Sequence, residues 1–127
     1  MTFLSATDIL QIDDSVFETV EVPEWNGTVR INGLTAYQRD KFEASVTVSR
    51  GKSFEINSIN IRAKLLAWTL ADKDGNLLFT EKDVKALSAK SGLVMNRLFG
   101  IARELSGMTE GDVEELVGNS EGDQDDS

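Results

Sequence analysis

The sequence predicts an α+β fold in which an N-terminal β-hairpin packs on a small, mainly α-helical domain. Asn26-Gly27 stands between alternating apolar residues, and both of its residues can adopt the positive φ that a type I′ hairpin turn requires. The phrase Thr-Glu-x-Asp-Val-x-x-Leu begins at Thr80 and again at Thr109. Thr is a good helix N-cap and an Asp three residues later can bond back to it, so each copy predicts a helix start.

The length and composition of the chain indicate one folded domain. A chain of 127 residues suits a single core. We assign residues 17–118 to one α+β domain and residues 1–16 to an N-terminal arm, which is either a short helix or a flexible segment. Residues 119–127 contain no apolar side chain and predict a disordered acidic tail.

The predicted hairpin has one apolar face. A two-residue turn at Asn26-Gly27 pairs Val22 with Ile31 and Trp25 with Thr28. The face that packs on the helices then carries Val20, Val22, Val29 and Ile31. The opposite face carries Pro23, Trp25 and Arg30. Pro23 also marks its strand as an edge strand, because proline cannot donate a hydrogen bond to a neighbour.

The middle of the chain predicts two helices separated by a less regular stretch. Thr35 and Gln38 form a capping box that opens a helix carrying Phe42 and Val46. Residues 46–56 suggest strand or loop around an Arg-Gly-Lys turn. The second helix has one face composed of Ile59, Ala63, Leu66, Ala67 and Leu70. Its other apolar residues include Trp68, which we expect in the core.

The helix between the two Thr-Glu-x-Asp copies has more apolar surface than a small core needs. Its core face carries Val94, Leu98, Ile101, Ala102 and Leu105. Leu93, Met95 and Phe99 broaden that face, so we expect the helix to contact a partner protein as well as the core. Trp25 lies beside the hairpin turn and either covers the edge of the core or makes an exposed contact. We therefore predict Trp25, Leu93, Met95 and Phe99 as partner-binding residues. Gly107 and Gly118 are natural stops for the last two helices.

The composition argues against an enzyme. The chain has no Cys and no His, which excludes disulfides, thiol nucleophiles, histidine acid–base catalysis and the usual zinc, copper or haem ligands. No glycine spacing matches a phosphate-binding loop after a strand. We expect no catalytic residues, no metal and no cofactor.

The net charge of −9 is unevenly distributed. Residues 1–29 hold six acidic and no basic residues, and residues 108–127 hold eight acidic and no basic residues. The segment between them has thirteen basic and eight acidic residues. An acidic chain is a poor nucleic-acid ligand, and no apolar run approaches the roughly 18 residues of a membrane span. We expect neither nucleic-acid nor membrane binding, and a cytosolic location.

The segment from Asp72 to Asp83 resembles an EF-hand calcium loop with two departures. Asp72, Asp74 and Asn76 stand at loop positions one, three and five. The position that needs glycine holds Leu77, and the position of the bidentate Glu holds the shorter Asp83. An ordinary turn leading into a helix is the preferred interpretation, and a degenerate calcium-binding protein is the alternative.

The order and spacing of several segments across residues 17–119 resemble a known family. They run from Val22-Pro23-Glu24-Trp25 through Thr28-Val29-Arg30-Ile31, Gly33-Leu34-Thr35, Arg62-Ala63-Lys64-Leu65, Asp72-Lys73-Asp74-Gly75-Asn76 and Asn96-Arg97-Leu98-Phe99 to Leu105-Ser106-Gly107-Met108-Thr109-Glu110. In this order they are similar to the tail assembly chaperones of long-tailed phages and prophages.

This resemblance implies a small non-enzymatic protein of the host cytoplasm that binds the tape measure protein. The chaperone would keep that protein soluble until tail-tube subunits polymerise around it, and would be absent from the mature virion. A longer frameshifted form would recruit the tail tube protein, and self-association is also expected. A structural tail-completion or connector protein of the virion is the alternative function.

Overall fold

The described part of the chain is an α+β domain that carries a separate N-terminal arm. A computed structural model describes residues 2–108, and the predicted helix from Thr109 and the predicted acidic tail lie outside them. The strands are β1 (Phe17–Val22), β2 (Gly27–Asn32), β3 (Thr47–Arg50), β4 (Ser53–Ile56) and β5 (Leu70–Ala71). The helices are α1 (Ala6–Gln11), α2 (Ala36–Val46), α3 (Ile61–Ala67), α4 (Val84–Leu87) and α5 (Gly92–Leu105), with 3₁₀ turns η1 (Pro23–Trp25) and η2 (Glu81–Asp83). The predicted fold class is confirmed.

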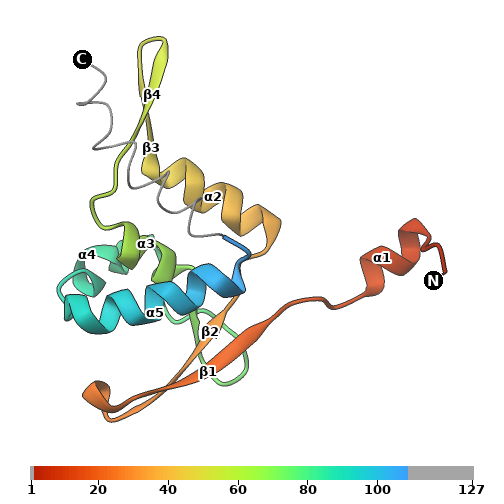
Figure 1. The fold of residues 1–127 in the computed structure, drawn as a ribbon, viewed down its shortest axis with the longest axis horizontal. Coiled ribbons are helices and arrows are strands. Elements are labelled where there is room, and N and C mark those ends of the chain that lie inside the picture. The colour runs from red at the N-terminus through yellow and green to blue at the C-terminus, as the bar shows by residue number, and fades with distance from the viewer. Residues whose placement is uncertain (1, 109–127) are drawn as a thin grey trace.

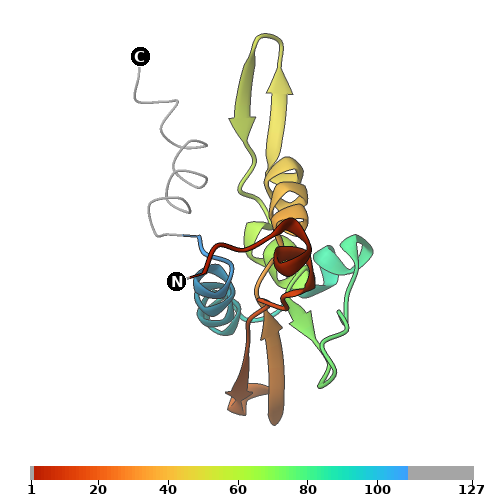
Figure 2. The same cartoon turned by 90° about the vertical axis from the view of Figure 1, so that its right-hand side faces the viewer.

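Two small antiparallel sheets frame the helices. The first has the strand order β1-β2-β5, and the second is the hairpin β3-β4. Helix α5 packs on both β2 and α3, and α2 packs on α3. The hairpin β3-β4 extends away from the body as a continuation of α2, as Figures 1 and 2 show.

The N-terminal hairpin forms as predicted, but its turn and register differ from the prediction. Val22 pairs with Gly27 and Val20 with Val29, so the strands are shifted by four residues from the predicted pairing. The turn is the 3₁₀ turn η1 followed by Asn26 at φ 54°. Pro23 causes the difference, because its fixed φ suits the start of a helical turn and it has no N–H to extend the ladder.

The shift leaves the predicted apolar face unchanged, because side chains alternate with a period of two and the shift is an even number of residues. Val22 and Ile31 are fully buried, and Val20 and Val29 pack against the core beside them. Trp25 was predicted on the opposite face. It lies in the 3₁₀ turn instead and packs half-buried against the core.

Helix α2 begins at the predicted capping box. The Thr35 hydroxyl accepts a hydrogen bond from the Gln38 N–H, and the Gln38 side chain accepts one from the Thr35 N–H. Phe42 and Val46 are buried as predicted. The stretch left open as strand or loop is the hairpin β3-β4, which turns at Gly51 with φ 65°.

The predicted helix from Ile59 to Leu70 is shorter than expected. Helix α3 covers only Ile61–Ala67, and the Ile59 side chain is exposed. After α3 the chain enters β5, where Leu70 pairs with Ile31, a strand that was not predicted from the sequence. The Thr69 carbonyl accepts a hydrogen bond from the Asn32 N–H at 2.8 Å, so pairing with β2 replaces the last helical turn.

The first Thr-Glu-x-Asp phrase caps a helical segment as predicted. The Asp83 carboxylate accepts a hydrogen bond from the Thr80 N–H, and the Thr80 hydroxyl accepts one from the Lys82 N–H. The turn η2 and helix α4 follow directly.

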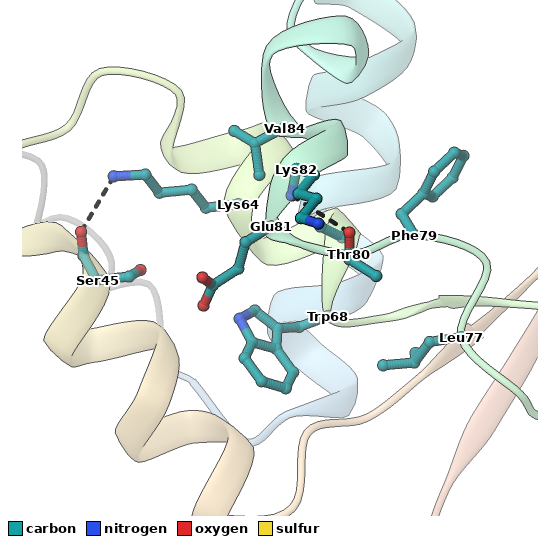
Figure 3. Close-up of a pocket in the computed structure, with 10 residues that line it drawn as sticks. Ser45, Lys64, Trp68, Leu77, Phe79, Thr80, Glu81, Lys82 and Val84 are labelled. Atoms are coloured by element: carbon teal, nitrogen blue, oxygen red, sulfur yellow. Dashed lines mark hydrogen bonds between the residues drawn. The ribbon is translucent and has the colours of Figure 1, made fainter.

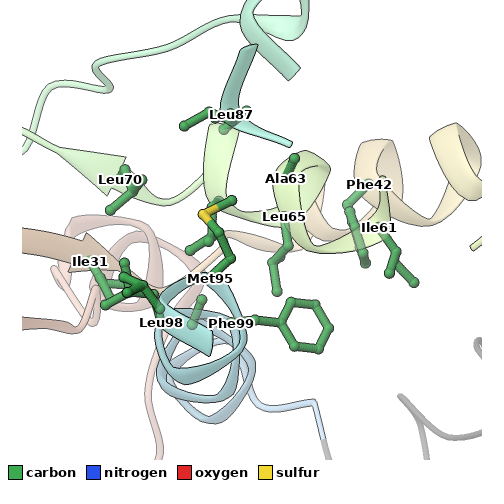
Figure 4. Close-up of a cluster of buried hydrophobic side chains, with 14 of the residues drawn as sticks. Ile31, Phe42, Ile61, Ala63, Leu65, Leu70, Leu87, Met95, Leu98 and Phe99 are labelled. Atoms are coloured by element: carbon green, nitrogen blue, oxygen red, sulfur yellow. The ribbon is translucent and has the colours of Figure 1, made fainter. Parts of the chain in front are cut away.

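Helix α5 supplies one wall of the core. It ends in a Schellman motif, in which the Gly107 N–H donates to the Glu104 carbonyl and the Met108 N–H donates to the Arg103 carbonyl. Gly107 has φ 71°, and the Met108 side chain is buried behind it. The core shown in Figure 4 includes Ile31, Phe42, Ile61, Leu65, Leu70, Met95, Leu98 and Phe99.

The N-terminal arm, residues 2–16, contains the short helix α1 and projects from the body (Figure 1). Ser5 and Asp8 form a capping box at its start, and α1 has no buried residue. The structure therefore favours the short helix over the flexible segment left open by the sequence.

Candidate protein-binding surfaces

The described residues carry exposed apolar surfaces, which are candidates for protein contacts. Within residues 2–108, no three His, Cys, Asp or Glu side chains are grouped to hold a metal ion. None of the helices in this range is both long enough and apolar enough to span a membrane.

Two carboxylates of the EF-hand-like segment, those of Asp72 and Asp83, accept hydrogen bonds from backbone N–H groups. The Asp72 carboxylate accepts hydrogen bonds from the N–H groups of Asp74 and Asn76, and the Asn76 bond is the main reason that the pKa of Asp72 is lowered. Asp83 instead caps the next helical segment. Strand β5 ends at Ala71, which bridges to Leu77, so the segment is a turn between extended chains and does not join two helices. This geometry favours the ordinary turn.

An open apolar groove lies between the C-terminal end of α2, helix α3 and residues 77–84 (Figure 3). Its volume is about 880 Å³ and its lining is more apolar than polar. The residues that line the groove are Ser45, Lys64, Ala67, Trp68, Leu77, Phe79, Thr80, Glu81, Lys82 and Val84. The Lys64 Nζ donates to the Ser45 carbonyl at 3.0 Å and fixes α3 against α2 at one end of the groove.

This groove was not predicted from the sequence. Trp68, expected in the core, is half-buried and packs against the core while also lining the groove. The usable signal was the apolar run Leu77-Leu78-Phe79, which follows a polar turn and has no strand or helix of its own to cover it. Its proximity to α3 depends on tertiary packing.

The four predicted partner-binding residues fall into two groups. Leu93 is 77% exposed at the start of α5. Met95 and Phe99 are 3% and 5% exposed and belong to the core, which corrects their expected surface position. Helix α3 packs on α5, and the Arg62 guanidinium of α3 lies over the Phe99 ring. Trp25 is half-buried, so Leu93 and Trp25 can contact a partner without unfolding.

An ion pair joins the hairpin turn that carries Trp25 to the helix that carries Leu93. Arg97 lies one turn after Leu93, and its two terminal nitrogens donate to the two Glu24 carboxylate oxygens at 2.9 Å each. Such a two-bond pair fixes orientation as well as distance. We call Glu24, Trp25, Leu93 and Arg97 the tip surface. The Arg97 hydrogen bonds lower the pKa of Glu24 to about 2 from its ordinary value of 4.5.

This ion pair gives a pH-dependent prediction. Because the folded pKa of Glu24 is about 2, the pair stabilises the fold fully above about pH 4.5 and loses that effect as the pH falls toward 2. The stability difference between wild type and Glu24→Gln should therefore be constant near neutrality and shrink in acid. Urea unfolding at several pH values between about 3 and 7 measures it.

Glu21→Gln is the matched control for this prediction, since it removes a carboxylate from the same hairpin. A difference for Glu24→Gln that stays the same at every pH would show that the pair does not stabilise the tip.

Taken together, the groove, the tip surface and the arm define a small binding protein, because exposed apolar surface of this kind marks contact sites. The sequence matches the phage tail assembly chaperone family over residues 8–121, and the chain belongs to that family. The predicted resemblance is confirmed. Family membership implies a non-catalytic role in building phage tails.

A solved structure has a similar fold. The tail assembly chaperone of bacteriophage HK97 superimposes with a TM-score of 0.56 at 22% sequence identity, over 75% of this chain and 85% of that chain. No curated protein sequence matches the chain.

Proposed function

We propose that this tail assembly chaperone binds the tape measure protein in the host cytoplasm and keeps it soluble during tail-tube assembly. The family match supports a role in tail assembly, and the chemistry of the surface supports an apolar client. The observation that carries the client assignment is the exposed Leu93, which lies one helical turn before Arg97, the residue that pairs with Glu24 at the hairpin turn. The proposal includes no enzymatic activity and release before the virion is complete.

The charge of the chain suits such a role. A net charge of −9 keeps a complex with an apolar client soluble through repulsion between complexes. The proposal also includes recruitment of the tail tube protein through a longer frameshifted form.

Co-expression with the cognate tape measure protein tests the proposal directly. The chaperone should move the tape measure protein from the insoluble to the soluble fraction, and the two should associate in pull-downs. A folded wild-type chaperone that neither binds nor solubilises the tape measure protein would end the proposal. Detection of the protein in purified virions would then favour the tail-completion or connector function.

Leu93→Ser should locate the client contact. We expect it to weaken association by about 1–3 kcal/mol, the usual cost of removing an apolar anchor from an interface. Ile59→Ser is the matched control, because Ile59 is also exposed but lies in the loop before α3. Equal binding by the two variants, both folded by circular dichroism, would place the client elsewhere on the chaperone.

A further inference from the structure

The N-terminal arm exposes more large apolar side chains than any other part of the described chain. Phe3 and Leu10 are 101% and 85% exposed, and Leu4, Ile9 and Ile12 are exposed as well. The hydrogen bonds of α1 are local, from the capping box and its own backbone. Isolated helices shorter than about 12–15 residues are marginal in water, so a helix of six residues depends on packing against another surface.

The base of the arm directs it away from its own body. The Gly33 N–H donates to the Val16 carbonyl at 2.9 Å, which fixes the last residue of the arm beside the end of α5. Figure 1 shows α1 on the side of the body opposite α4, and Figure 2, viewed from that side, shows α1 in front. The groove lies by α3 and α4, so the arm points away from the groove of its own chain.

The arm and the groove are chemically complementary. The apolar side chains that line the groove include Trp68, Leu77 and Phe79, and its charged residues are two lysines, Lys64 and Lys82, and one carboxylate, Glu81. Besides its apolar side chains, the arm carries three acidic residues, Asp8, Asp13 and Asp14, and it has no basic residue. An acidic, apolar segment fits an apolar groove that holds more basic than acidic residues, both by burial and by charge.

We propose that the arm of one copy of the protein docks in the groove of a second copy. The two surfaces differ, so the contact is heterologous and can repeat through successive copies. This assigns a surface to self-association and is independent of the tape measure protein, since it requires only this chain.

Self-association of the full chain tests the proposal. Wild type should increase in mass with concentration in analytical ultracentrifugation. The double variant Phe3→Ser/Leu10→Ser should weaken association by about tenfold or more, as loss of anchor residues does. Both side chains are fully or nearly fully exposed, so the fold should be unchanged. Phe54→Ser is the matched control, because it removes a comparably exposed aromatic from β4 and should leave association intact.

A mixing experiment separates this contact from any other self-association. Leu77→Ser/Lys82→Glu changes the groove and leaves the arm intact, whereas the arm variant leaves the groove intact. Each variant alone should be largely monomeric, and an equimolar mixture should form a one-to-one complex, because one copy supplies the arm and the other the groove.

Three results would overturn the proposal. They are a wild type that stays monomeric at high concentration, arm variants that associate as wild type does, and variants that fail to complement each other on mixing. A monomeric wild type whose arm variants lose only tape measure binding would make the arm a client-binding segment instead.

Discussion

Phe99→Ala is expected to lower the free energy of unfolding by about 3–5 kcal/mol, which is a large part of the roughly 5–15 kcal/mol that stabilises a domain. The side chain is buried in the core, and Figure 4 shows its ring close to Leu65 of α3. The Arg62 guanidinium lies over the ring at 5.6 Å from its centroid and donates to the Asn96 side chain. Removing the ring leaves a cavity between α3 and α5. Chemical unfolding measures the loss.

Leu93→Ala on the same helix is the control for this prediction. Its side chain is exposed, so the free energy of unfolding should change by less than about 0.5 kcal/mol. Comparing the two variants also shows whether Phe99 is a core residue or a residue that contacts the tape measure protein. If Phe99→Ala is as stable as Leu93→Ala but loses tape measure binding, Phe99 is a contact residue and the core assignment is wrong.

Gly33→Ala should destabilise the protein by about 1–3 kcal/mol, the usual cost of overpacking a filled site. A Cβ at this position would lie 2.5 Å from the Leu105 carbonyl oxygen and 2.9 Å from the Val16 Cγ2. The Leu105 oxygen belongs to the end of α5, which is held by its Schellman motif and by the Ser106 hydroxyl that accepts from the Leu34 N–H at 3.0 Å. The backbone therefore has to shift to admit a methyl group.

Gly100→Ala is the matched control, because no atom beyond its chain neighbours and the backbone of its own helix lies within 4 Å of the Cβ it would add. Alanine in the middle of a helix is about 0.5–1 kcal/mol better than glycine, so this variant should be stabilised. Thermal unfolding of the two variants should give changes of opposite sign. Changes of the same sign would show that the close contact at Gly33 relaxes at little cost.

The features that were predicted correctly depend on neighbours in the sequence. The capping boxes at Thr35 and Thr80 join residues three apart, and the stop at Gly107 depends on a positive φ that glycine adopts easily. The apolar face of the hairpin was also correct despite the wrong register, since alternation decides the face whichever residues are paired.

The features that were missed depend on segments far apart in the sequence. Strand β5 exists because its residues pair with β2, some forty positions earlier, and that pairing ended α3 sooner than its apolar pattern predicted. The groove likewise requires α2, α3 and residues 77–84 to come together.

The sequence alone determined the α+β class, the helix starts at Thr35 and Thr80, the apolar face of the hairpin and the family, because these depend on local hydrogen bonds, alternation and the order of segments along the chain. Only the tertiary structure decided which apolar side chains are covered. Leu93 and Met95 stand two positions apart on α5, yet one is exposed and the other buried. Residues two apart on a helix face different directions, and the position of α3 determines which direction is the core.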